Sequence, residues 1–293
     1  MRALALLLAG ALALAGCGKQ GRDWPAPSPA LWEVRAPEGE VAGAPGEPAG
    51  WLFGTIHALP ADADWRTPAL QAALDRSDML VVEVAELGDA AAAAQAFASR
   101  ARTPGLPPLT ARVPPADRPA LAAALASAGL AEEDFADVES WAAALQLTSA
   151  LRRHESANGV DRALIEGAER VTGLESLDAQ FALFDALPQG AQAQLLATVA
   201  REAGAADQDR RVAAWLAGDL ARLSRDAQSG LLADPALRQA LLLARNRAWA
   251  RRIHALIAAG ERPFVAVGAA HMLDAEGLPA LLAARGYEVR RIQ

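Results

Sequence analysis

Two of the four histidines in this chain end the same short motif, Gly-x-x-His, near opposite ends of the sequence. Residues 54–57 read Gly-Thr-Ile-His and residues 268–271 read Gly-Ala-Ala-His, so the motifs end in His57 and His271. An apolar run precedes each motif, and apolar runs beside turn residues are typical of buried strands. In open α/β sheets, ligands bind beyond the carboxyl ends of such strands. The two motifs therefore predict one shared site that contains both imidazoles.

A glutamate interrupts a third apolar run. Glu83 lies within residues 79–84, Met-Leu-Val-Val-Glu-Val, a β-branched stretch that is typical of a buried strand. A buried carboxylate is costly without a partner, so Glu83 is expected to have a cation, a metal ion or a hydrogen-bond network beside it. The alternative is an edge strand whose glutamate faces solvent.

His57, His271 and Glu83 together would form a site of two histidines and one carboxylate. These ligands suit zinc, manganese, cobalt or iron, and three protein ligands leave room for a bound water. Such an ion would lower the pKa of that water and create a nucleophile near neutral pH. The alternative for either histidine is a structural, hydrogen-bonded role. Arg245, within residues 235–258, reads by itself as part of an ordinary polar helix face, and Asp161 as a helix cap.

Strands are predicted near both ends of the chain, with helices between them. The expected strands are 31–34, 51–56 (antiparallel to the first), 79–84, 263–267 and 287–292, with a short strand or turn at 173–176. The expected helices are 68–76, 90–102, 115–128, 132–153, 160–170, 178–187, 190–203, 207–217, 235–258 and 275–285. Neither end alone offers enough strands for a sheet. We therefore predict one α/β domain over residues 30–293, with a mixed central sheet built from both chain ends and a helical insertion at about 88–258.

The first 16 residues have the pattern of an export signal. A positive end precedes an apolar run at residues 3–14, which is too short to span a bilayer, and residues 14–17 read Leu-Ala-Gly-Cys. This tetrapeptide looks like a bacterial lipobox, which predicts lipidation of Cys17; ordinary cleavage and a soluble secreted form are the alternative. Residues 17–29 read as an extended tether. Gly18 favours the outer membrane of the cell envelope, with the domain facing the periplasm.

Composition excludes several classes of protein. The 293 residues carry a formal net charge of -7, which argues against a nucleic-acid partner and offers no basic face to anionic lipid. The single cysteine excludes an internal disulfide and a thiolate metal cluster.

These motifs, taken in order, resemble the TraB/GumN family, whose relatives include the Tiki proteases, the erythromycin esterases and the ChaN-type lipoproteins. The resemblance covers almost the whole mature chain. It rests on residues 31–34, 52–57, 81–83, 159–161, 173–176 with Gln180, 215–219, 245–246 with Trp249, 267–271 and 285–289.

The resemblance implies a mixed-sheet α/β fold in which the two strand–Gly-x-x-His–helix units are related by approximate internal symmetry. It also implies that His57, Glu83, Arg245 and His271 line one cleft. The sequence departs from the family pattern at Ala270, where a glycine is common before the histidine. It departs again at residues 36–50, an unusually long Pro/Gly-rich loop.

The relatives differ in activity. Tiki relatives are described as divalent-metal-dependent proteases, erythromycin esterases activate water with a histidine and acidic residues, and ChaN-type proteins bind haem. We therefore expect a membrane-anchored, extracytoplasmic, metal-dependent and peptidase-like hydrolase that uses zinc, manganese or cobalt and acts on a peptide or small molecule. Arg245 would stabilise an oxyanion or orient a carboxylate.

Two alternatives stay open: a metal-free His/Glu esterase-like hydrolase, and a non-catalytic protein that binds haem or a peptide. Haem iron takes Tyr, His or Met as an axial ligand, and the only tyrosine, Tyr287, lies in the last expected strand, which disfavours haem.

Overall fold

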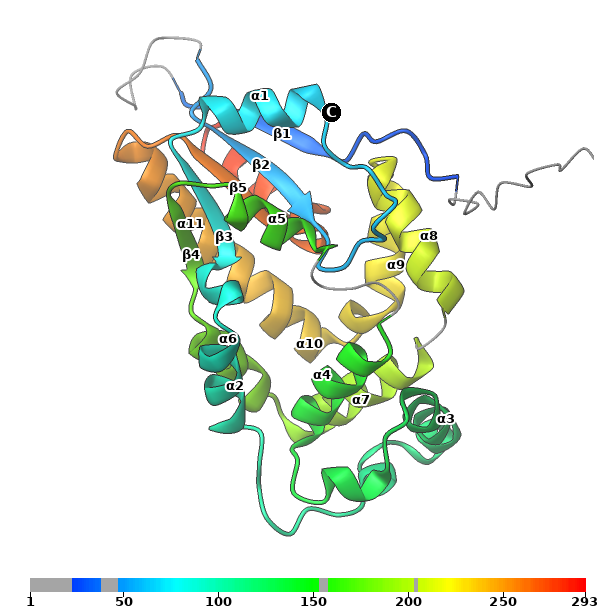
Figure 1. Ribbon diagram of the computed structural model, residues 1–293. Coiled ribbons are helices and arrows are strands. Elements are labelled where there is room, and N and C mark those ends of the chain that lie inside the picture. The colour runs from blue at the N-terminus through cyan, green and yellow to red at the C-terminus, as the bar shows by residue number, and fades with distance from the viewer. Residues whose placement is uncertain (1–22, 38–46, 153–157, 203–204) are drawn as a thin grey trace, which may run out of the picture.

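The computed structural model describes residues 23–37, 47–152, 158–202 and 205–293 (Figure 1). Its centre is a six-stranded mixed sheet in the order β4-β3-β5-β2-β1-β6. The strands are β1 (Leu31–Arg35), β2 (Gly50–Thr55), β3 (Met79–Val84), β4 (Val171–Glu175), β5 (Pro263–Gly268) and β6 (Glu288–Arg291). The predicted mixed α/β fold, with a sheet built from both ends of the chain, is confirmed.

Four neighbouring strands of this sheet run in the same direction. β5 is parallel to β2 on one side and to β3 on the other, and β4 is parallel to β3. β1 is antiparallel to β2, as predicted, and β6 is antiparallel to β1. Because Thr55 of β2 stands opposite Gly268 of β5, the two Gly-x-x-His motifs leave the sheet side by side.

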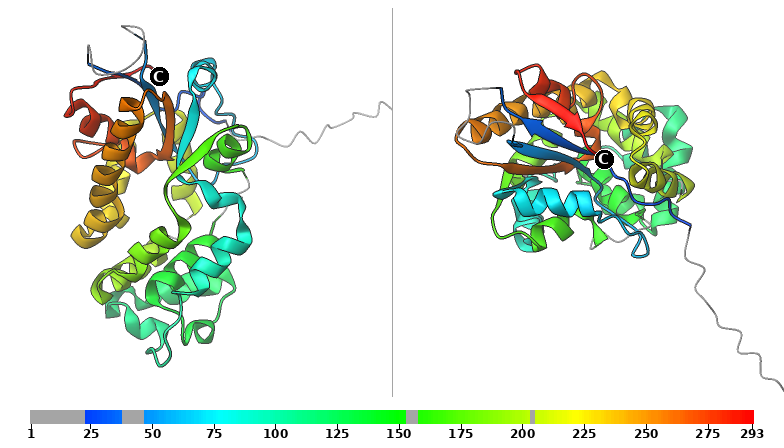
Figure 2. Two further views of the ribbon diagram at one scale, coloured as in Figure 1. Left: turned by 90° about the vertical axis from the view of Figure 1, so that its left-hand side faces the viewer. Right: turned by 90° about the horizontal axis from the view of Figure 1, so that it is seen from above.

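Successive side chains of the strands point alternately into two hydrophobic cores, one on each face of the sheet. Trp51 and Phe53 of β2 point into one core, and Leu52 points into the other. The first core lies beneath α1 (Pro68–Arg76), α5 (Val160–Glu166) and α8 (Ala205–Leu216), and the second beneath α11 (Ala244–Ala258) and α12 (Leu278–Ala283). α5 and α11 accordingly lie on opposite sides of the sheet (Figure 2).

A helical lobe with its own core lies beyond the sheet, in the lower half of Figure 1. It contains α2 (Ala90–Ala98), α3 (Arg118–Ala128), α4 (Ser140–Ala150), α6 (Leu177–Asp185), α7 (Gln189–Arg201) and α10 (Pro235–Arg238). The fully buried Trp141 is central to this core, where its ring stacks on Phe184 and meets Phe97 edge to face. The chain between α5 and α6 returns to the sheet as β4, so the region predicted as a helical insertion also supplies a strand.

One predicted helix was wrong, and one helix of the structure was missed. The range 132–153 contains a 3₁₀ turn, Glu132–Phe135, and an α-helix that begins only at Ser140. The Arg112 guanidinium donates hydrogen bonds to the carbonyl of Phe135, at the end of the 3₁₀ turn, and to the carbonyl of Val138, in the stretch before the α-helix. Helix α9 (Leu220–Ser229) was not predicted; Asp219 caps it by accepting a hydrogen bond from the backbone N–H of Arg222 (2.9 Å).

One long helix connects the helical lobe to the sheet. α10 passes into α11 through a π-helical turn, Gln239–Leu243, which holds one residue more than a regular turn. Leu237 and Leu241, at its start, belong to the core of the helical lobe, whereas Trp249 and Ile253 belong to a core of the sheet.

The segment just before β1 packs on the body of the protein. Residues 23–29 form neither helix nor strand, but the Ser28 N–H donates to the Leu216 carbonyl (2.7 Å) and the Gln293 side chain donates to the Pro29 carbonyl (2.8 Å). The expected signal peptide, Cys17 and the first part of the expected tether lie outside the described residues, as does most of the loop at residues 36–50.

Candidate functional site

The carboxyl ends of the four parallel strands carry a row of ionisable side chains. Along the sheet order, β4 ends in Glu175, β3 carries Glu83, β5 leads into His271 and β2 leads into His57. The structure thus places the predicted residues along one edge of the sheet, together with Glu175, which was not predicted as a site residue.

Glu83 is buried and both of its carboxylate oxygens are engaged. Oε1 accepts a hydrogen bond from the backbone N–H of Gly268 (2.8 Å), and Oε2 accepts one from Nη2 of Arg245 (2.8 Å). Only 9% of the residue is exposed, so the alternative of an edge-strand glutamate facing solvent does not apply. Burial alone would raise the pKa of Glu83, but the His271 ring, which is protonated only at low pH, the Arg245 cation and the Gly268 N–H lower it to about 2.

Arg245 connects the two glutamates. Its Nε and Nη2 atoms donate to the two carboxylate oxygens of Glu175 at 2.9 and 3.1 Å, while Nη2 also reaches Glu83. Nη1 donates to the Leu241 carbonyl (3.1 Å), which lies in the π-helical turn. The guanidinium lies over the ring of Trp249 (4.5 Å to the centroid), whose indole N–H donates to Glu175 (3.0 Å). Fixed pairs of this kind hold both carboxylates in a single orientation.

His271 is buried and its tautomer is fixed by Asn246. Asn246 donates from Nδ2 to the Glu276 carbonyl (2.7 Å), so its Oδ1 faces His271 and accepts from Nδ1–H at 2.5 Å. The lone pair of the ring is therefore on Nε2, which lies 3.4 Å from Nη1 of Arg245 and 3.8 Å from Oε1 of Glu83. Burial lowers the pKa of His271 to about 4, so the ring is neutral near pH 7 and Arg245 supplies the permanent counter-charge to Glu83.

His57 is held in a similar way but lies open to solvent. Its Nδ1 is 2.8 Å from Oδ2 of Asp161, a carboxylate that also accepts a hydrogen bond from the Thr55 hydroxyl. The hydrogen bond to Asp161 raises the pKa of His57 to about 9. Because 62% of the His57 side chain is exposed, water screens part of this effect. Nε2 is then the ring atom available for chemistry.

Asp161 reaches His57 because the first turn of α5 is joined to the first motif. The Val160 N–H donates to the Ile56 carbonyl (3.1 Å), and Asp161 follows as the second helical residue. The sequence reading of Asp161 as a helix cap is corrected accordingly, since Gly159 occupies the cap position.

The motif glycines allow close approach at two places. A Cβ on Gly54 would lie 3.0 Å from the Cα of Ala269 in the second motif, and a Cβ on Gly268 would lie 3.0 Å from Oε1 of Glu83. Such contacts are tighter than side chains tolerate without a shift of their neighbours. The glycines therefore let the two motifs pack together and let Glu83 bind the backbone of the second motif.

The donor chemistry of this edge suits a divalent ion, because two imidazoles have their Nδ1 atoms committed to side-chain oxygens and an ionised carboxylate lies near one of them. Within the described residues, however, no three His, Cys, Asp or Glu side chains lie close enough together to hold a metal ion. His57 forms no hydrogen bond or ion pair with Glu83 or His271 in the described chain. The predicted metal ion therefore stays a prediction.

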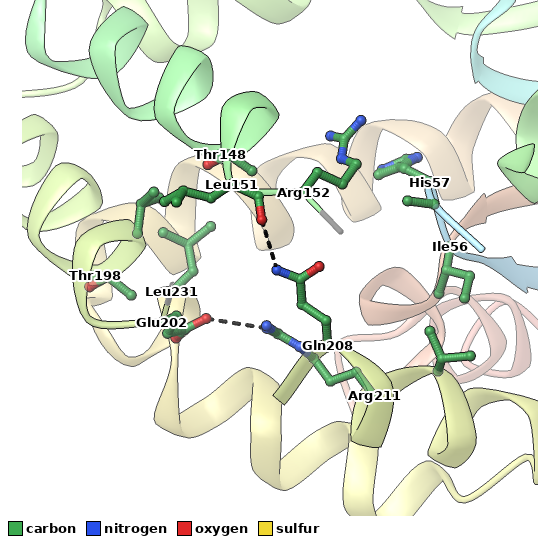
Figure 3. Close-up of a pocket in the computed structure, with 13 residues that line it drawn as sticks. Ile56, His57, Thr148, Leu151, Arg152, Thr198, Glu202, Gln208, Arg211 and Leu231 are labelled. Carbon is green, nitrogen blue, oxygen red and sulfur yellow. Dashed lines mark hydrogen bonds and ion pairs between the residues drawn. The ribbon is translucent and has the colours of Figure 1, made fainter. Parts of the chain in front are cut away.

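Two cavities open onto the edge from the side of the helical lobe. One, of about 440 Å³, reaches His57, and the other, of about 350 Å³, reaches His271 and Arg245. Glu202 and Arg211, which form an ion pair at 3.2 Å, line both cavities (Figure 3).

Three residues of this network were missed as site residues by sequence reasoning: Asp161, Glu175 and Asn246. Each stands inside a motif that carried the resemblance, but its residue type there also fits a helix cap, a strand end or a polar helix face. The one sign in the sequence that could have identified them is that each is a polar residue inside a motif of the resemblance. No periodic pattern marks them as site residues.

No helix in the part of the chain that the structure describes is long and apolar enough to cross a membrane. In a comparison with known protein families, residues 31–291 match the TraB/PrgY/gumN family. No curated protein and no solved structure matches the chain. Because the match spans nearly all of the 293 residues, from β1 to the end of β6, this chain belongs to the TraB/PrgY/gumN family.

Proposed function

We propose that this TraB/PrgY/gumN protein is a hydrolase that activates water between its two Gly-x-x-His motifs. In this proposal Cys17 carries a lipid anchor, and the domain works outside the cytoplasm, at the outer membrane on the periplasmic side. The substrate is a peptide or a small molecule with a similar bond.

One observation carries the proposal. The two histidines follow neighbouring strands, β2 and β5. A side-chain oxygen binds Nδ1 of each ring, from Asp161 for His57 and from Asn246 for His271. Carboxylate or amide oxygens that fix a histidine in this way are typical of histidines whose Nε2 binds a metal ion or transfers a proton. A histidine that served only packing would not need a buried polar partner at each site.

The residues have distinct roles in this proposal. Glu83, His57 and His271 would hold a zinc, manganese or cobalt ion, which when bound lowers the pKa of a water and polarises the scissile carbonyl. Asp161 and Asn246 orient the imidazoles. Arg245 acts as a positioning residue, because its donors are committed to Glu83, Glu175 and the Leu241 carbonyl.

A second candidate is a hydrolase without a metal ion, which the engagement of Glu83 favours. Both oxygens of this carboxylate already have donors, and one of these is the Arg245 cation, which would repel a divalent ion. In this version His57 transfers protons through Nε2 while Asp161 stabilises the imidazolium.

One experiment tests the proposal and separates the two candidates. The mature domain is incubated with a panel of peptides and activated esters, before and after treatment with a chelator, and its metal content is measured by elemental analysis. The metal-dependent version predicts a stoichiometric ion and activity that disappears with chelation. The metal-free version predicts activity that survives chelation and is lost in His57→Ala. A protein that hydrolyses none of the panel with or without added zinc, manganese or cobalt would contradict both versions, and a haem titration would then test the binding alternative.

A further inference from the structure

The cavity at His57 is mainly apolar and has the size of a small-ligand site. It lies between the loop after β2, the end of α4, α7 and α8, and its volume of about 440 Å³ falls within the range of small-molecule pockets. Leu151, Val199, Val212 and Leu231 form much of its wall, and His57 stands at one side (Figure 3). A ligand in this cavity would place an apolar group on these side chains with its polar end near His57.

Most of the polar groups around the cavity have partners. Arg211 pairs with Glu202 at 3.2 Å, and the Gln208 side chain donates to the Leu151 carbonyl at 3.3 Å. Both interactions are drawn in Figure 3. These groups need no ligand to satisfy them.

Arg152 differs from these groups. It lines the cavity just beyond α4, half-buried, and forms no ion pair with any carboxylate in the described chain. Figure 3 shows its guanidinium on the same side of the cavity as His57. In a chain with a net charge of -7, an arginine that pairs with none of the described carboxylates adds a local positive charge beside an apolar cavity.

We propose that this cavity is a substrate subsite for a free carboxylate attached to an apolar group, with Arg152 as the specificity-determining residue. The inference rests on the proposed hydrolase function and names its substrate class: a peptide or N-acyl amino acid whose apolar C-terminal residue occupies the cavity. The planar guanidinium of arginine binds a carboxylate through two parallel hydrogen bonds, and such charge-assisted bonds gain strength away from bulk water.

The reaction itself needs only water. Hydrolysis breaks the amide C–N bond, the acyl carbon gains the water hydroxyl and the nitrogen gains the proton. The carboxylate held by Arg152 stays intact and fixes the adjacent bond near His57.

Binding can be measured in the full mature chain by calorimetric titration with N-acetyl-leucine, N-acetyl-leucinamide and octanoate, and the recovered ligand is then analysed to check that its amide bond is intact. We expect N-acetyl-leucine to bind at least tenfold more tightly than the amide. Arg152→Gln should remove this difference, and Arg152→Lys, which keeps the charge without the two-pronged geometry, should restore part of it. Arg251→Gln is the matched control, because it removes one positive charge from an exposed position of α11 outside the cavity.

Equal affinity for the acid and the amide, or an unchanged affinity in Arg152→Gln, would overturn the subsite. Octanoate binding that depends on Arg152, without binding of N-acetyl-leucine, would overturn the peptide substrate class, because the carboxylate would then come from a fatty acid. If carboxylate-dependent binding is intact but no bond is ever hydrolysed, the subsite stands and the proposed hydrolase function fails.

Discussion

Oδ1 of Asn246 lies 2.5 Å from Nδ1 of His271. Asn246 directly follows Arg245 in α11, the arginine that binds Glu83. Consecutive residues of an α-helix diverge by about 100°, so Arg245 and Asn246 point to different strands of the sheet. Arg245 binds the glutamates of β3 and β4, and Asn246 binds the histidine in the turn after β5. The orientation of one helix therefore determines how a carboxylate and an imidazole are presented to each other.

Replacing Arg245 by methionine should destabilise the protein strongly. Glu83 and Glu175 would both keep buried negative charges without their common cation, and breaking a buried ion pair costs about 3–5 kcal/mol. Urea unfolding should show this as a lower midpoint. Arg170→Met, which removes an exposed ion pair with Glu261, is the control and should change the midpoint little. A shift for Arg245→Met no larger than that of the control would refute the structural role.

Both motif histidines should contribute to stability, in different ways. His271→Ala leaves Oδ1 of the fully buried Asn246 without its donor, which costs about 1–3 kcal/mol. His57→Ala removes an exposed ring but leaves the buried Asp161 carboxylate with only the Thr55 hydroxyl of its two side-chain partners here, so it should also lower the melting temperature, most at low pH where the pair is charged. Thermal unfolding measures both effects.

If the two histidines share a divalent ion, both variants should also lose that ion and the hydrolytic activity. His254→Ala is the comparison, because His254 binds the Tyr287 hydroxyl (2.7 Å) and is not one of the proposed ligands; this variant should keep the ion and the activity. Retention of a stoichiometric ion in His57→Ala would argue against a shared metal site.

The titration of His57 should depend on Asp161. In the metal-free protein, proton NMR of the His57 ring should show a pKa above the ordinary value of 6.5 and no higher than about 9, and Asp161→Asn should return it towards 6.5. Because the folded pKa is raised, the contribution of this pair to folding is complete below pH 6.5 and is lost as the pH rises through about 9. The excess stability of wild type over Asp161→Asn should therefore shrink between these values. A pH-independent difference would contradict it.

The membrane anchor is tested by Cys17→Ser. The tetrapeptide at residues 14–17 predicts that this change blocks lipidation and moves the protein from the membrane fraction to a soluble or unprocessed form. Fractionation followed by detection of the protein measures the effect. Equal membrane association of the variant and the wild type would show that another feature of the chain holds it there.

Local patterns predicted the central strands β2, β3 and β5 well because each of them is a short apolar run bounded by turn residues. Pro68 at the start of α1 and the Thr67 side chain that caps it illustrate how a helix start can be found from two residues. The break before α4 could not be found in this way, since it depends on a guanidinium from Arg112, far away in the sequence.

The same contrast applies to the site. Glu83 stands out because it interrupts an apolar run, and His57 and His271 stand out because each ends a Gly-x-x-His motif after such a run. Arg245 was identified through the family resemblance. Asp161 and Asn246 contact the two imidazoles across 104 and 25 residues of sequence, and no periodicity connects residues so distant. These two contacts can be recognised only in the three-dimensional structure, where β2 and β5 lie side by side.

The π-helical turn before Arg245 has a consequence for the length of this helix. Leu237 and Leu241 face the core of the helical lobe, while Trp249 and Ile253 face the sheet, and the extra residue sets the angular phase between these two groups. Deleting one residue from Gln239–Leu243 would restore a regular helix and turn one group by about 100° relative to the other. The side chains of one group could then still pack into their core, but those of the other group would point away from theirs. The number of residues in the π-helical turn therefore fixes how the helical lobe is rotated relative to the sheet. An insertion or deletion in this turn should disturb the fold as much as a substitution in either core.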